Sequence, residues 1–182
     1  MIQSVLHLPY RREDVYSVLS DFANYRMWLP GCTVSNVLSE SGGQTLLELT
    51  TEALNLMEMR FDVEPGHSVR FTMVRGRELK TYAGLHRLED SSDGKGTVVF
   101  NEVEVDAGIL VPRFLLDRIG HRILDEMGRS LGERVQATSG EGRPAPTRPL
   151  DIRRQPRRIL QVADTPNGRR IWYRGRIYVP KQ

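Results

Sequence analysis

The chain lacks most of the residue patterns from which catalytic and metal sites are commonly built. Cys32 is its single cysteine among 182 residues, which excludes a disulfide framework and any site with several thiolate ligands. Its four histidines have no metal-ligand spacing, so we expect neither a metal site nor a cofactor. A glycine-rich phosphate loop and a G-x-S-x-G motif are also missing, and the sequence therefore assigns no catalytic residue.

Long apolar runs are missing as well. The longest, near residues 107–112, is far shorter than a membrane helix needs and contains Gly108, so we expect no membrane span. The N-terminus has neither a basic segment nor a long apolar one, which argues against a secretory signal peptide. We therefore predict a cytoplasmic localisation.

The charge of the chain is unevenly distributed. Residues 138–182 carry 11 basic and 3 acidic side chains, a net charge of +8, whereas the remainder carries −5. A mildly acidic body with a basic tail predicts two electrostatically distinct regions. Composition divides the chain into a domain at 1–137, a linker rich in proline and arginine at 138–156, and a basic, aromatic, β-hairpin-like tail at 157–182.

Hydrophobic periodicity predicts an α+β domain that ends in a long helix. Residues 2–8 alternate as a strand does, 12–20 have helical spacing, and 22–29 form a second short segment. Short turns join the later β-prone runs, which favours an antiparallel meander. Those runs are 33–38, 45–54, 57–63, 69–74, 79–88 and 98–105. The closing helix is predicted from about 112 to 137, with its apolar stripe at Leu116, Ile119, Ile123, Met127, Leu131 and Val135.

Three glycines, Gly120, Gly128 and Gly132, lie on nearly one side of this predicted helix. Each costs about 1 kcal/mol relative to alanine in a helix interior. Either close packing of the helix on the sheet or space for a ligand beside the helix must offset that cost. Of the two explanations we favour close packing.

Residues 15–31 read V-Y-S-V-L-S-D-F-A-N-Y-R-M-W-L-P-G. They resemble the V-x-x-L-x-D-F-x-x-Y-x-x-W-x-P segment of the SRPBCC (START/Bet v1-like) superfamily, in its polyketide cyclase/dehydrase and coenzyme-Q-binding branch. Residues 96–100, which open the last strand, and Pro112, which opens the closing helix, extend the resemblance over residues 2–137. It implies a helix-grip fold, in which a curved antiparallel sheet wraps the C-terminal helix and leaves an apolar cavity. Nothing in the family pattern accounts for the tail.

Alternation along the predicted strands agrees with such a cavity. Met57, Met59 and Phe61 share one strand face, and Phe71 and Met73 continue it on the next strand. Methionine is flexible and can repack around ligands of varied shape, although each of these residues could also simply fill a core. The predicted ligand-binding residues are Tyr25, Trp28, Met57, Met59, Phe61, Phe71, Met73, Asn101, Leu115, Ile119 and Ile123.

Whether the domain could be catalytic depends on which polar side chains point into it. Asn101 shares a face with three valines and should point inward, whereas Glu102 and Glu104 should face solvent. Arginines expected on outward positions are Arg60, Arg70 and Arg87. A cyclase needs an inward base or arginine to steer an enolate, and the sequence offers no convincing one.

These observations predict binding or transport of a hydrophobic small molecule, namely a lipid, an isoprenoid quinone or a polyketide. Two alternatives stay open. One is a polyketide cyclase or dehydratase. The other is an interaction module that associates with a protein or the ribosome through the basic tail, as the ribosome-associating toxins of the same superfamily imply.

The tail interleaves arginines with aromatic residues, a pattern that can contact phosphates and stack on bases. It could equally dock on the acidic body, on a protein partner, or on a second copy in a homo-oligomer. We expect it to be β-structured and favour a partner or second subunit over self-docking. The predicted partner-binding residues are Arg169, Arg170, Trp172, Tyr173, Arg174 and Arg176.

Overall fold

The computed structural model describes the backbone of residues 1–52, 54–107, 113–139, 160–165, 168–173 and 176–178, and the side chains of 1–52, 54–107 and 118–139. Its first elements are β1 (Ile2–Leu8), α1 (Arg12–Ser20) and the 3₁₀ helix η1 (Phe22–Met27). The strands that follow are β2 (Cys32–Ser41), β3 (Gln44–Thr51), β4 (Asn55–Glu64), β5 (Ser68–Arg75), β6 (Thr81–Asp90) and β7 (Thr97–Asp106). The long helix α2 spans Arg113–Thr138.

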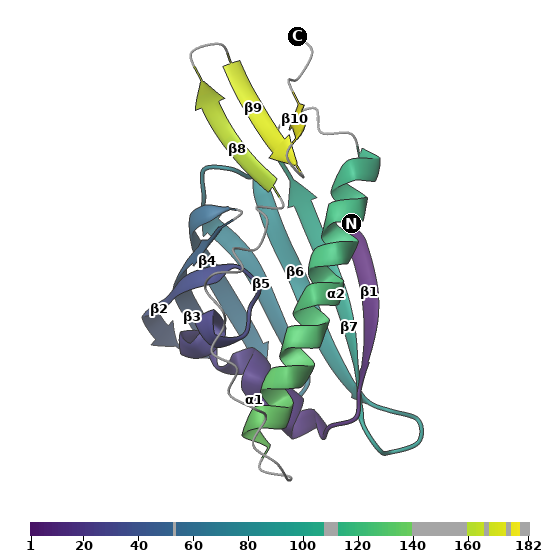
Figure 1. Ribbon diagram of the computed structural model, residues 1–182. Coiled ribbons are helices and arrows are strands. Elements are labelled where there is room, and N and C mark those ends of the chain that lie inside the picture. Colours follow the sequence, from purple (N-terminus) through teal and green to yellow (C-terminus); the bar gives the residue numbers. More distant parts are fainter. Residues whose placement is uncertain (53, 108–112, 140–159, 166–167, 174–175, 179–182) are drawn as a thin grey trace.

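The seven strands β1–β7 form one antiparallel sheet in the order β1-β7-β6-β5-β4-β3-β2. Six strands follow one another as a meander, and β1 joins β7 at the far edge, with Ile2 opposite Val103 and Leu8 opposite Thr97. The predicted antiparallel α+β layout and its order of elements are confirmed. With α2 lying along one face of the sheet (Figure 1), this is a helix-grip fold.

Helix α2 packs on β1 and α1, and its glycines explain how closely it does so. A Cβ atom added at Gly120 would overlap the end of the Ile2 side chain. At Gly128 it would come within 3.0 Å of the Leu6 side chain, and at Gly132 within 3.3 Å of the Leu8 side chain. The close-packing explanation is therefore the one that the structure supports.

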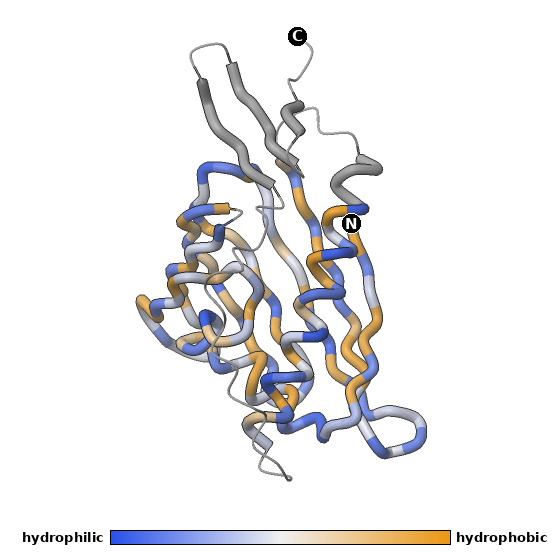
Figure 2. The backbone as a smooth tube through the Cα atoms, in the orientation of Figure 1, coloured by the Kyte–Doolittle hydropathy of each residue, from blue (hydrophilic) through white to orange (hydrophobic). Residues whose placement is uncertain are grey.

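The core lies between the sheet, α1, η1 and α2, and hydrophobic residues alternate with hydrophilic ones along most strands (Figure 2). The buried stripe of α2 differs from the predicted one at a single described position. Ile123 is 40% exposed, and Leu124, at 7%, takes the inward place instead. Because a helix advances 100° per residue, one position decides which of two adjacent apolar residues faces inward. The assignment of Ile123 to the ligand-binding face was wrong.

The described residues after 159 form three further antiparallel strands, β8 (Leu160–Thr165), β9 (Gly168–Tyr173) and β10 (Arg176–Tyr178). They form a separate sheet in the order β10-β9-β8. Trp172 lies opposite Gln161 on one side and Ile177 on the other. Among the residues described, no helix is both long and apolar enough to cross a membrane.

Candidate functional site

A row of aromatic rings crosses the inner face of the sheet from η1 to β6. Ring centroids lie 5.2 Å apart between Trp28 and Tyr25, 5.7 Å between Tyr25 and Phe61, and 6.2 Å between Phe61 and Phe71. Phe71 then lies 5.3 Å from the imidazole of His86. Such edge-on and tilted contacts are the favoured geometries for aromatic pairs. The row gives the inner face a continuous apolar surface with a polar ring at each end.

At the β6 end of this row, three polar side chains form a hydrogen-bonded line across adjacent strands. The sheet register sets His86 opposite Asn101 and Asn101 opposite Ser4. The Nδ1 atom of His86 lies 2.7 Å from the Oδ1 atom of Asn101, and the Asn101 amide nitrogen donates to the Ser4 hydroxyl at 3.1 Å. His86 and Asn101 are only 6% and 2% exposed. Hydrogen bonding offsets the cost of burying these groups.

The hydrogen-bond pattern fixes the form of the imidazole. An amide oxygen only accepts, so Nδ1 of His86 carries the proton and Nε2 keeps its lone pair. Burial lowers the pKa of His86 below its usual value, an effect that outweighs the opposing hydrogen bond to Asn101. His86 is therefore a neutral imidazole in the folded protein, with a basic nitrogen inside the domain.

This burial predicts a pH dependence of stability. Because the unfolded chain protonates His86 at a higher pH than the folded protein does, the free energy of unfolding should fall as the pH drops through about 6.5. Urea unfolding at pH values from about 5 to 8 measures this slope. A His86→Gln variant should show a shallower fall in the free energy of unfolding than the wild type does. An unchanged slope in His86→Gln would contradict the prediction.

At the η1 end of the row, Trp28 is 7% exposed and its indole Nε1 is buried without a hydrogen-bond partner. The neighbouring Tyr25 differs, because its hydroxyl donates to the Leu19 carbonyl at 2.6 Å. The D-F-x-x-Y-x-x-W-x-P segment places both rings, because Tyr25 lies on η1 and Trp28 directly follows it.

Most of the predicted ligand-binding residues lie in the interior, on the sheet, on or beside η1, and on α2. Those with little exposure are Tyr25, Trp28, Met57, Met59, Phe61, Phe71, Asn101 and Ile119, and Met73 is partly buried against them. The side chain of Leu115 lies outside the described residues. Met57 and Met59 are each 1% exposed, so in this state the methionines and rings pack against one another.

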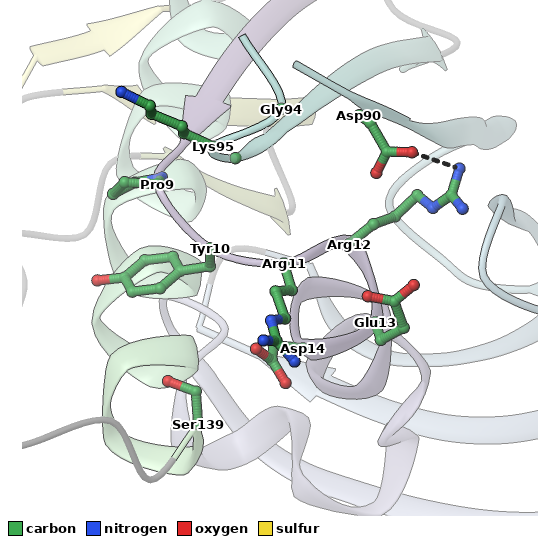
Figure 3. A pocket seen from close by; sticks show the side chains of 11 residues that line it. Pro9, Tyr10, Arg11, Arg12, Glu13, Asp14, Asp90, Gly94, Lys95 and Ser139 are labelled. Atoms are coloured by element: carbon green, nitrogen blue, oxygen red, sulfur yellow. Dashed lines mark ion pairs between the residues drawn. The ribbon is translucent and has the colours of Figure 1, made fainter. Parts of the chain in front are cut away.

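Two surface pockets lie elsewhere. One, of about 290 Å³, is lined by Tyr10, Arg11, Glu13 and Lys95 beside the Arg12–Asp90 ion pair of 3.4 Å (Figure 3). Its mixed charges around the start of α1 do not suit an apolar ligand. The other, of about 170 Å³, is lined mostly by outward positions of β5, β6 and β7. Neither is the apolar cavity that the family resemblance implied.

Sequence reasoning missed His86. Alternation along residues 79–88 could have found it, because His86 shares its strand face with the inward Leu88. The expectations for charged residues are confirmed: Arg60, Arg70 and Arg87 are exposed, as are Glu102 and Glu104.

The predicted partner-binding residues lie outside the described side chains, and Arg174 lies outside the described backbone as well. Binding of a protein or ribosomal partner through the tail therefore stays a prediction.

The chain was compared with protein families, with curated protein sequences and with solved structures. Residues 8–131 match the profile of a family described as polyketide cyclase/dehydrase and lipid transport. No curated protein sequence matches the chain closely enough to count as a relative.

Solved structures with the same fold include an aromatase/cyclase, ZhuI from Streptomyces sp. R1128, at 16% identity and a TM-score of 0.64, covering 76% of this chain and 96% of that one. A START superfamily protein from Mycobacterium smegmatis matches at 15% identity and a TM-score of 0.63, covering 74% and 96%. A STAR-related lipid transfer protein from Xanthomonas axonopodis matches at 18% identity and 0.59, covering 74% and 84%. At these identities the likeness establishes the fold alone.

Proposed function

The chain belongs to the polyketide cyclase/dehydrase and lipid transport family of the SRPBCC superfamily, and from that premise we propose that it binds a hydrophobic small molecule between its sheet and α2. The ligand class is a lipid, an isoprenoid quinone or a polyketide. The observation that carries the proposal is the aromatic row on the inner face, flanked by Met57, Met59 and Met73. An apolar molecule gains most where such a surface is removed from water.

The inner face is tightly packed, but the residues that fill it are compatible with ligand binding. Methionine has an unbranched, flexible side chain, and the three methionines border the row on β4 and β5. The Met73 sulfur occupies the space that a side chain at Gly76 would take. Rotation of these side chains would admit a ligand without moving the sheet.

Native mass spectrometry of the purified protein, followed by organic extraction, tests the proposal. We expect a retained apolar molecule, or one-to-one binding of added 2-acetylnaphthalene or 2-isopropylnaphthalene. A Met73→Trp variant should weaken binding because it fills the inner face. The matched control is Val74→Trp, since Val74 is 58% exposed on the next residue of β5.

Equal loss of binding in both tryptophan variants would show that the inner face is not the site. A wild-type protein that retains nothing and binds neither naphthalene would contradict the proposed function itself.

A second candidate, cyclisation or dehydration of a polyketide, is favoured by one specific observation. His86 holds an unprotonated Nε2 inside the domain in a fixed tautomer, which is the form that a general base requires. A turnover assay on the Asn101→Ala and Glu102→Ala variants distinguishes an enzyme from a protein that only binds its ligand. If His86 acts as a base, removing its Asn101 partner should lower turnover, whereas removing the exposed Glu102 carboxylate should not.

A further inference from the structure

We propose that the indole Nε1 of Trp28 donates a hydrogen bond to an oxygen atom of the ligand. The site would then select apolar molecules that carry a carbonyl or hydroxyl oxygen over plain hydrocarbons of the same shape. The inference rests on the proposed function, because it concerns the ligand of the same inner face. Trp28 would then determine specificity, and the ligand would have to carry an oxygen acceptor.

Among the described residues, Trp28 differs from the buried polar side chains around it, which are hydrogen-bonded. Nearby, the Ser35 hydroxyl donates to the Phe22 carbonyl, and the Tyr25 hydroxyl bonds within the protein as well. Near the opposite edge of the sheet, on β7, the Thr97 hydroxyl donates to the Tyr10 carbonyl at 2.7 Å. Because these hydroxyl groups all have hydrogen-bond partners, the unpartnered N–H of Trp28 calls for an explanation.

Among the described residues, two other side-chain atoms are buried without a partner, and both belong to less buried groups. Arg12 keeps an ion pair with Asp90 through another nitrogen. Glu78 accepts a hydrogen bond from Asn55 at 2.7 Å through its other oxygen. The indole of Trp28 has no second polar atom, so its only hydrogen-bonding capacity is unused.

The missing partner can be specified chemically. An indole N–H only donates, so the partner must be an acceptor, and in an apolar site the stable acceptors are neutral oxygens. A buried donor left unpaired is unfavourable, and a ligand that supplies the acceptor removes that penalty. Trp28 contacts the aromatic row through Tyr25, so a ligand lying along the row reaches the indole at one end.

The test uses the full-length protein and two probes of equal size, the ketone 2-acetylnaphthalene and the hydrocarbon 2-isopropylnaphthalene. We expect the wild type to bind the ketone about five- to tenfold more tightly than the hydrocarbon, as one net hydrogen bond allows. Trp28→Phe keeps an aromatic ring but lacks the N–H, and it should bring the two affinities together. Ser35→Ala also removes a buried donor, but one already satisfied, and it should leave the preference for the ketone unchanged.

Nuclear magnetic resonance of the ¹⁵N-labelled wild type gives a readout that needs no variant to fold. The chain has two tryptophans, so two indole N–H signals are expected, and the signal of Trp28 should move downfield with the ketone but not with the hydrocarbon. If both probes bind equally and neither moves this signal downfield, the role of Trp28 is wrong while the proposed function stands. If neither probe binds, the proposed function itself fails.

Discussion

A Phe61→Ala variant is expected to lose about 3–5 kcal/mol of the free energy of unfolding, the usual cost of removing a buried phenylalanine. Phe61 is 4% exposed and sits in the middle of the aromatic row. Its ring centroid lies 4.5 Å from that of Phe22 and within contact of Tyr25 and Phe71 on either side. Urea unfolding followed by circular dichroism measures the loss.

The matched control is the same substitution at Phe100 on the outer side of β7. That ring is partly exposed and packs under the Arg87 guanidinium, 4.9 Å from its centroid, a contact worth about 0.5–1 kcal/mol at exposed sites. Phe100→Ala should therefore cost much less than Phe61→Ala. Comparable losses in the two variants would mean that the aromatic row is not the centre of the core.

A Gly84→Ala variant should also be strongly destabilised, by about 3 kcal/mol, at the upper end of the cost of overpacking. A Cβ atom at this position would overlap both the backbone oxygen of Glu102 on β7 and the tip of the Phe71 ring. The Glu102 oxygen cannot move without disturbing the pairing of β6 with β7. Thermal unfolding should show a lower melting temperature and no gain in ligand binding.

Gly120→Ala is the informative comparison for this second variant. There the added Cβ meets the side chain of Ile2 but no backbone atom, and alanine favours the helix by about 1 kcal/mol. Gly84→Ala should thus be the more destabilising of the two variants, because only there does the added Cβ meet a backbone atom. A mild effect at Gly84 would show that the ring of Phe71 and the strand both have room to shift.

Much of this fold follows from the sequence because its signals are local. Two-residue alternation fixed which sides of β4 and β5 face inward, and the buried Met59 and Phe61 confirm it. The choice between Ile123 and Leu124 could not be made in the same way. Both are apolar and adjacent, and the contact of the helix with β1 decides between them.

The site was less accessible to sequence reasoning because its polar elements depend on pairing between distant strands. His86 acquires its tautomer from Asn101 and Asn101 its second bond from Ser4, residues 15 and 97 positions apart in the chain. The unpartnered nitrogen of Trp28 likewise depends on what surrounds it in three dimensions. Composition alone indicates an aromatic ring but not whether its N–H is satisfied.

The pairing of β1 with β7 has a consequence for how the chain folds during synthesis. Ile2, Leu6 and Leu8 are synthesised about a hundred residues before their sheet partners at 97–103 and the helix that covers them. Contacts between such distant segments slow folding, since the intervening loop must close first. Until α2 has been synthesised, β1 therefore has neither its sheet partner nor its covering helix, and its apolar side chains stay exposed. A nascent chain halted before that helix would present an aggregation-prone strand and recruit chaperones.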